Sequence, residues 1–230
     1  MTNQKTAAII VAAGRGERMG GLNKMFAPLL GKPVLAWAVD TFQQCPLIDQ
    51  IVIVLTEQSI EQGKKLVVER EWSKVTDVCV GGEERQQSVA AGLNLLKDCQ
   101  WVVIHDGARP MVTEDLIKAG LEAAKESGAA VAAVPVTDTI KLADDGGFVI
   151  GTPPRKRLWA VQTPQVFHFD IITGAHQRAE GMATDDASLV ERLNHRVKLY
   201  MGSYDNIKIT TPGDLALAEI LLKILLKRGG

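Results

Sequence analysis

The chain has 230 residues, of which 46% are hydrophobic and 23% charged, and its formal net charge is −1. This is the composition of a globular protein without a global basic field for nucleic acid, so any anion has to be bound by local cations. The three cysteines have no C-x-x-C spacing, so they suggest neither a disulfide framework nor a zinc site, and they fit a reducing cytoplasm. No apolar stretch approaches the roughly 20 residues that span a bilayer.

Short apolar runs alternate with stretches of helical periodicity along the chain. The runs are rich in Val, Ile or Ala and occupy residues 7–12, 50–55, 101–105 and 129–134. Such runs are typical of central parallel strands, although a run alone does not exclude a buried helix. Helical spacing occupies residues 33–44, 59–72, 84–97 and 113–127. This alternation predicts an α/β fold with a mostly parallel twisted sheet flanked by helices, and it places ligands beyond the carboxyl ends of the strands.

Local signals mark the ends of some helices. Thr113 can cap the helix that follows it, and Gly128 can end that helix. The sequence TPGD at 211–214 supplies an N-cap, a proline and an acid, so a final amphipathic helix is expected to begin there. Just upstream, residues 205–210 predict a strand that contains Lys208, a cation that is unusual in an apolar run unless it lies at an edge or faces an anion.

Residues 139–154, TIKLADDGGFVIGTPP, interrupt the alternation. Two short extended runs flank DDGG, which is a strong hairpin signal. We therefore expect a protruding β-hairpin arm at about residues 137–160. It could be a lid, an arm that reaches a partner, or a plain surface hairpin followed by a solvated basic stretch.

The first apolar run ends in a glycine loop that carries several cations, AAGRGERMGGLNK. Its spacing does not fit a dinucleotide fingerprint, because Met19 stands where the third glycine is needed, and it does not fit a Walker loop, because Leu22 replaces the lysine. The run also resembles the core of a secretory signal. No polar spacer separates it from the loop, however, which disfavours a signal peptide.

Several residues of this loop suit an anion site. Small residues let backbone N–H groups approach an anion at the end of a strand. They are Ala12, Ala13, Gly14 and Gly16. Arg18 and Lys24 add two cations. Either cation alone could simply be solvated, but together they indicate a polyphosphate site, because fixed cations stabilise the charge that accumulates in nucleotidyl transfer.

The segment HDGARP at 105–110 directly follows another buried run. Asp106 therefore lies at the carboxyl end of a strand, where a carboxylate can hold Mg²⁺ or a sugar hydroxyl, and Arg109 can face a phosphate. The plainer alternatives are a turn residue for Asp106 and a structural role for His105.

Two further segments combine loop and helix signals. In GGEERQQSV, residues 81–89, two glycines precede a helix start and Ser88, and Gly82 could let a flat base approach the backbone. An ordinary strand-to-helix turn is the alternative. In ATDDAS, residues 183–188, acids stand in what is predicted to be the first turn of a helix.

Seven motifs in this order resemble the 2-C-methyl-D-erythritol 4-phosphate cytidylyltransferase family. They are AAGRGERM…NK, GGEERQQSV, HDGARP, VTDTIK, TPQVF, TDDAS and DNIKIT, and the match runs from Ala7 to about Leu222. Each motif alone is weakly specific, whereas the ordered set is specific. The resemblance implies a Rossmann-like nucleotidyltransferase fold in a single domain over residues 1–230, CTP as co-substrate, Mg²⁺, pyrophosphate release and a homodimer with exchanged arms.

The resemblance also implies roles for individual residues. Arg18 and Lys24 match transition-state cations, and the contacts to CTP match Ala12, Ala13, Gly14, Gly82 and Ser88. The positions that hold the methylerythritol phosphate and the metal or ribose match Asp106, Arg109, Thr139, Thr184 and Lys208. Arg155 and Thr163 match residues that the neighbouring subunit contributes. Gly16 belongs to the predicted CTP loop, and Arg155 and Lys208 join the predicted catalytic set.

Two departures from the family pattern stand at Val11, often proline, and at Gln87, often aspartate. We expect the first to change only backbone rigidity and the second to affect how the base or nearby waters are held. Because the sequence given ends at Gly230, no fused downstream cyclase domain is expected. Two other functions stay open: a ribitol 5-phosphate cytidylyltransferase, and a nucleotide-binding module without turnover. The module would leave Lys24, Arg109, Arg155 and Lys208 unexplained as a set.

Overall fold

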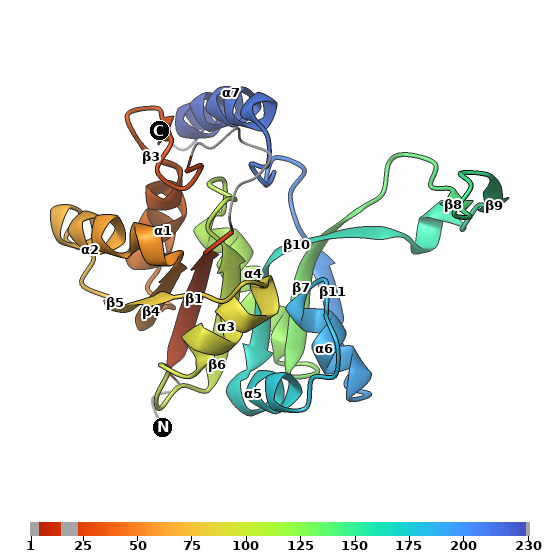
Figure 1. Cartoon of the computed structure of the whole chain (residues 1–230), viewed down its shortest axis with the longest axis horizontal. Helices are drawn as coiled ribbons and strands as arrows, with labels where there is room; N and C mark the ends of the chain where they lie inside the picture. The colour runs from red at the N-terminus through yellow and green to blue at the C-terminus, as the bar shows by residue number, and fades with distance from the viewer. Residues whose placement is uncertain (1–4, 15–22, 229–230) are drawn as a thin grey trace.

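The computed structural model describes residues 5–14 and 23–228. Its centre is a seven-stranded sheet with the order β11-β7-β10-β6-β1-β4-β5 (Figure 1). The strands are β1 (Thr6–Ala12), β4 (Gln50–Leu55), β5 (Val75–Val80), β6 (Trp101–Asp106), β7 (Ala129–Pro135), β10 (Trp159–His168) and β11 (Lys198–Met201). The four predicted runs all form strands, with ends within a residue of those expected, and β1 pairs in parallel with both β4 and β6.

Strand β10 is the exception to the parallel arrangement. It lies between β6 and β7 and runs antiparallel to both. The predicted mostly parallel sheet is thus correct for the remaining pairs, which are β1 with β4 and β6, β4 with β5, and β11 with β7. The sequence of β10 contains Pro164 and alternates less regularly than the apolar runs, so periodicity does not single it out.

Helices cover both faces of the sheet. On one face α1 (Val34–Gln44), α2 (Ile60–Glu69) and α4 (Glu114–Ala124) contribute to one buried cluster, and on the other α3 (Arg85–Leu93), α5 (Phe169–Gln177) and α6 (Asp186–Arg192) contribute to a second. Thr113 caps α4 by accepting the N–H of Leu116, and Gly128 adopts the left-handed φ of 78° after that helix, as predicted.

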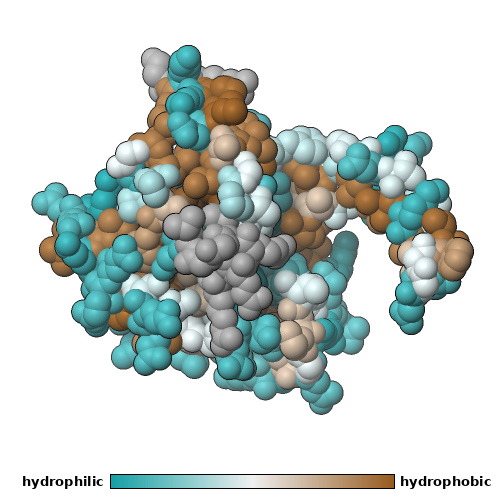
Figure 2. Space-filling model, turned by 45° about the horizontal axis from the view of Figure 1, so that its top comes forward, coloured by the Kyte–Doolittle hydropathy of each residue, from teal (hydrophilic) through white to brown (hydrophobic). Residues whose placement is uncertain are grey.

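Helix α7 (Pro212–Arg228) begins where TPGD predicts it. The Asp214 carboxylate accepts the backbone N–H groups of Thr210 and Thr211, which satisfies two donors near the helix start. The helix buries Ala218 and Leu222 above the short strands β2 (Pro28–Leu29) and β3 (Lys32–Pro33). Its outer face is less polar than an amphipathic helix should be, because Leu217, Ile220 and Ile224 are exposed there, and Figure 2 shows hydrophobic surface gathered at this end. Among the described residues, no helix is long and apolar enough to cross a bilayer.

The predicted hairpin is present and projects away from the sheet (Figure 1). Strands β8 (Leu142–Ala143) and β9 (Val149–Gly151) pair antiparallel around a turn in which the Asp144 carboxylate accepts the N–H groups of Gly146 and Phe148. The described residues also contain short 3₁₀ turns at Glu57–Ser59 and Arg155–Arg157. The arm is continuous with β10, which follows the second of these turns and enters the middle of the sheet.

Candidate active site

The carboxyl end of β1 borders a first cavity, with a volume of about 120 Å³. Ala13 and Gly14, directly after β1, meet Gly82, which precedes α3, and Ser88 in the first turns of α3, and Lys24 lines the same cavity. A Cβ on Gly81 would lie 2.5 Å from the Ala13 Cβ and from the Ser88 Oγ, so this turn approaches β1 too closely for any side chain. Ala12 lies directly before this rim and is buried in β1.

A capping box fixes the start of α3. Glu84 is the N-cap, and its backbone N–H donates to the Gln87 Oε1 at 3.1 Å. The buried Ser88 hydroxyl donates to the Glu84 carbonyl at 3.2 Å. Gln87, which departs from the family pattern, therefore caps the N-terminus of its own helix in this chain.

Asp106, the last residue of β6, is surrounded by cations. Its Oδ1 lies 3.1 Å from the Arg85 Nε, and its Oδ2 lies 2.8 Å from the Lys208 Nζ and 3.8 Å from the Arg109 Nε. Burial raises the pKa of Asp106, but the charges of Arg85, Lys208 and Arg109 outweigh burial and hold that pKa well below its usual range. Asp106 therefore stays ionised across the physiological range.

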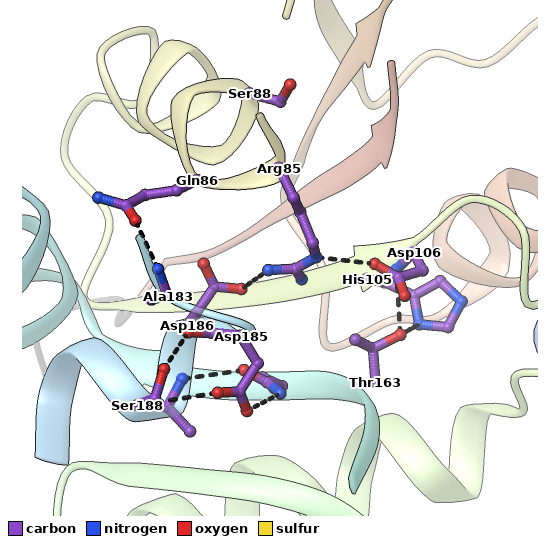
Figure 3. Close-up of polar contacts among 12 residues, drawn as sticks. Arg85, Gln86, Ser88, His105, Asp106, Thr163, Ala183, Asp185, Asp186 and Ser188 are labelled. Carbon is purple, nitrogen blue, oxygen red and sulfur yellow. Dashed lines mark hydrogen bonds and ion pairs between the residues drawn. The ribbon is translucent and has the colours of Figure 1, made fainter. Parts of the chain in front are cut away.

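Arg85 was not among the predicted site residues. It is the first residue of α3, and its guanidinium spans Asp106 and Asp186, whose Oδ2 lies 2.7 Å from the Arg85 Nη1 (Figure 3). Asp186 in turn faces the His176 Nε2 at 3.3 Å. Both motifs, GGEERQQSV and TDDAS, contain these residues, but nothing in a single sequence indicates that positions 101 residues apart form an ion pair.

His105 and Thr163 form a buried pair behind Asp106. The Thr163 Oγ accepts the N–H of Asp106 at 3.0 Å, so its one hydrogen donates to the His105 Nδ1, also at 3.0 Å, and the His105 Nε2 donates to the Arg109 carbonyl at 3.1 Å. Burial lowers the pKa of His105 to about 4, so the ring is neutral. The Thr163 hydroxyl is bonded on both sides within its own chain, and the implied contribution of Thr163 to a neighbouring subunit stays a prediction.

A second cavity of about 320 Å³ adjoins the first. Arg85, Asp106 and Lys208 line both cavities. The second is lined as well by Arg109, Thr163 and Thr184, so the structure brings these predicted substrate residues together. Arg109 is held by its Nη1, which donates to the Asn206 carbonyl at 2.6 Å.

The segment that carries Lys208 is not the strand that the sequence predicts. It has an irregular backbone, fixed near the site by the Ile209 N–H, which donates to the Ala108 carbonyl at 2.9 Å. Ile209 is buried below it, and the Ile209 carbonyl accepts the Lys24 Nζ at 3.3 Å. The apolar residues on either side of Lys208 therefore anchor a loop, which places two predicted cations on the same rim.

Some predicted residues lie elsewhere. Thr139 and Arg155 are exposed on the arm, where the Arg155 Nη1 donates to the Thr137 carbonyl, and neither lines either of these two cavities. Gly16 and Arg18 lie outside the described residues.

The described residues contain no cluster of three His, Cys, Asp or Glu side chains that could hold a metal ion. Both Asp106 oxygens face cations. The predicted metal role of Asp106 does not fit this arrangement, because a divalent ion there would compete with Arg85 and Lys208 for the same carboxylate.

The order of the motifs and this arrangement agree with a known family. The family described as IspD: 2-C-methyl-D-erythritol 4-phosphate cytidylyltransferase matches residues 6–224. The chain belongs to this cytidylyltransferase family. It is 56% identical to a protein of Dehalococcoides mccartyi named 2-C-methyl-D-erythritol 4-phosphate cytidylyltransferase, with 96% of this chain and 97% of the relative covered. A protein of the same name from Alkaliphilus oremlandii is 48% identical, with 95% of each chain covered.

Solved structures agree on the fold. The 4-diphosphocytidyl-2C-methyl-D-erythritol synthase of Anaerococcus prevotii superposes with a TM-score of 0.86 at 32% identity and 96% coverage of both chains. The resemblance to the cytidylyltransferase family and the Rossmann-like nucleotidyltransferase fold are thereby confirmed.

Proposed function

We propose that this chain transfers CMP from CTP to 2-C-methyl-D-erythritol 4-phosphate, giving 4-diphosphocytidyl-2-C-methyl-D-erythritol and pyrophosphate for non-mevalonate isoprenoid synthesis. The observation that carries the proposal is the pair of adjoining cavities that share Arg85, Asp106 and Lys208. One lies at the glycine-rich end of β1 and suits a nucleotide, and the other carries Arg109 and Lys208 and suits an anionic acceptor.

In this scheme a phosphate oxygen of the acceptor attacks the α-phosphorus of CTP in line. The new P–O bond forms as the bond to the pyrophosphate oxygen breaks, and no covalent enzyme intermediate is needed. Lys24 and Lys208 both line the first cavity, and Lys208 also lines the second. We assign them, with Arg18, to stabilising the charge on the phosphates. The Asp106 carboxylate would accept a hydrogen bond from a hydroxyl group of the ribose or of the polyol.

The remaining components belong to the same proposal. Mg²⁺ bound together with the triphosphate would supply positive charge that neutralises part of the charge on the phosphates. A homodimer would let each arm bring Thr139 and Arg155 to the site of the other copy. The exposed apolar side chains of the arm, Leu142, Phe148, Val149 and Ile150, support burial against a partner. The free Cys45, Cys79 and Cys99 support a cytoplasmic location.

The test is pyrophosphate release with Mg²⁺ and CTP, run in parallel with methylerythritol 4-phosphate and with ribitol 5-phosphate. We expect release with the first acceptor only. Release with ribitol phosphate only would keep the nucleotide site but change the acceptor. Binding of CTP without release in either reaction would favour a binding module.

A further inference from the structure

We propose that Arg85 and Asp186 are a positioning pair for the acceptor site: Asp186 anchors Arg85, and Arg85 holds Asp106 so that Lys208 and Arg109 keep their charge for the acceptor phosphate. This inference rests on the proposed function and extends it to residues on α3 and α6. Three segments far apart in the sequence meet at this one guanidinium, the starts of α3 and α6 and the end of β6.

Asp186 is placed as an anchor. Its side chain is only 1% exposed and lines neither cavity, so it does not reach a substrate directly. Its two oxygens have separate partners, the Arg85 Nη1 and the His176 Nε2. It also lies in the first turn of α6, where the helix dipole favours a negative charge. A carboxylate this buried keeps Arg85 in one orientation.

Arg85 is not fully satisfied by this arrangement. Its Nη2 is buried and has no hydrogen-bond partner among the described residues. A buried donor without a partner is unfavourable. The carboxylates of Asp106 and Asp186 hold the Arg85 guanidinium in a position that leaves the Nη2 donor without a partner. This indicates that the bridge between the two carboxylates fixes the position of Arg85.

The charge balance gives the bridge a function. Among the described residues, Asp106 faces three cations, of which Arg109 and Lys208 line the acceptor cavity without also contacting Asp186. Without Arg85, Asp106 would be neutralised by Lys208 and Arg109 alone, and these would attract an anionic acceptor less strongly. The loss should therefore appear in acceptor binding before it appears in CTP binding.

The experiment compares Asp186→Asn, Arg85→Gln, Arg85→Lys and the double variant Asp186→Asn/Arg85→Gln by steady-state kinetics. Acceptor binding is measured by calorimetry with a non-reactive CTP analogue. We expect Asp186→Asn and Arg85→Gln each to raise the acceptor KM and Kd roughly tenfold, with the KM for CTP changed less than about threefold. The double variant should be no worse than Arg85→Gln, because Asp186 acts through Arg85. Arg85→Lys, which keeps the charge and is the variant least at risk of misfolding, should lie between wild type and Arg85→Gln.

Asp40→Asn is the matched control. Asp40 also binds an arginine, Arg70, with a largely buried carboxylate, but it lies on α1 and lines neither cavity. It should lower the unfolding temperature without changing the acceptor KM. A wild-type acceptor KM in Asp186→Asn, or additive effects in the double variant, would overturn the positioning pair and leave the proposed function intact. Wild-type protein that neither binds nor turns over methylerythritol phosphate would overturn the proposed function and this inference with it.

Discussion

The charge cluster around Asp106 and the hairpin arm both carry residues that the sequence assigns to the site, but the chain holds them in opposite ways. In the cluster, Asp106 is buried and contacts Arg85, Arg109 and Lys208. On the arm, Thr139 and Arg155 are exposed, and so are apolar side chains nearer its tip, such as Phe148 and Val149. Packing within one chain places the first group, whereas the second lies on an arm that projects away from the sheet (Figure 1). Four predictions test this difference.

The largest expected effect is on Lys24, at the rim of the first cavity. Lys24→Ala should lower kcat by about 1000-fold with little change in the KM for either substrate, because a fixed cation matters most when charge builds up in the transition state. Steady-state kinetics measures it, with the exposed Lys64→Ala as a control. A rise in KM without a fall in kcat would assign Lys24 to ground-state binding instead.

The second prediction concerns the cluster's interior. Because the pKa of His105 is lowered to about 4 from 6.5, the unfolded chain binds a proton between these values and the folded chain does not. The stability contributed by the neutral ring is therefore complete above pH 6.5 and is lost as the pH falls toward 4, by about 3 kcal/mol in total.

Urea unfolding at pH 7, 6, 5 and 4.5 measures this loss, and His105→Gln should flatten the dependence over this range. If the free energy of unfolding of His105→Gln falls with pH as steeply as that of the wild type, groups other than His105 cause the pH dependence.

The third prediction tests whether the arm acts on another copy. Arg155→Ala should lower kcat/KM by about 100-fold without lowering the unfolding temperature, since the side chain is exposed. Mixed in equal amounts with Lys24→Ala and allowed to exchange subunits, it should recover about a quarter of wild-type activity, because half the dimers then hold one intact site. Two inactive variants that stay inactive after proven exchange would contradict arm exchange.

The smallest expected effect is on association. Phe148 at the arm tip is 75% exposed, and Val68 on α2 is 77% exposed. Phe148→Asp should raise the dimer dissociation constant about tenfold, because it removes apolar contact and adds a charge, whereas Val68→Asp should not change it. Sedimentation velocity over a dilution series measures both. Equal changes of the dimer dissociation constant in both variants would show that the arm tip does not lie in the dimer interface.

The sequence predicted the parts of the molecule that depend on local patterns. β1, β4, β6 and β7 are continuous apolar runs, and Thr113, Gly128 and TPGD are local capping signals, so their positions are confirmed. The family resemblance added several residues of both cavities, among them Asp106 and Lys208, but not Arg85. The Arg85–Asp186 bridge depends on how α3 and α6 pack, and the strand expected at Lys208 is wrong because Ile209 packs a loop rather than a sheet edge.

The antiparallel β10 also constrains the order in which this protein can fold as it leaves the ribosome. β1, β4, β5 and β6 are complete by residue 106 and pair only with one another until β10 arrives. β7 emerges earlier than β10, but its two neighbours in the sheet are β10 and β11, so it has no strand partner until residues 159–168 are made. At this stage the nascent chain therefore holds four strands that can pair with one another and one apolar strand without a strand partner. The whole arm must be synthesised before β10 can join β6 to β7 and complete the sheet.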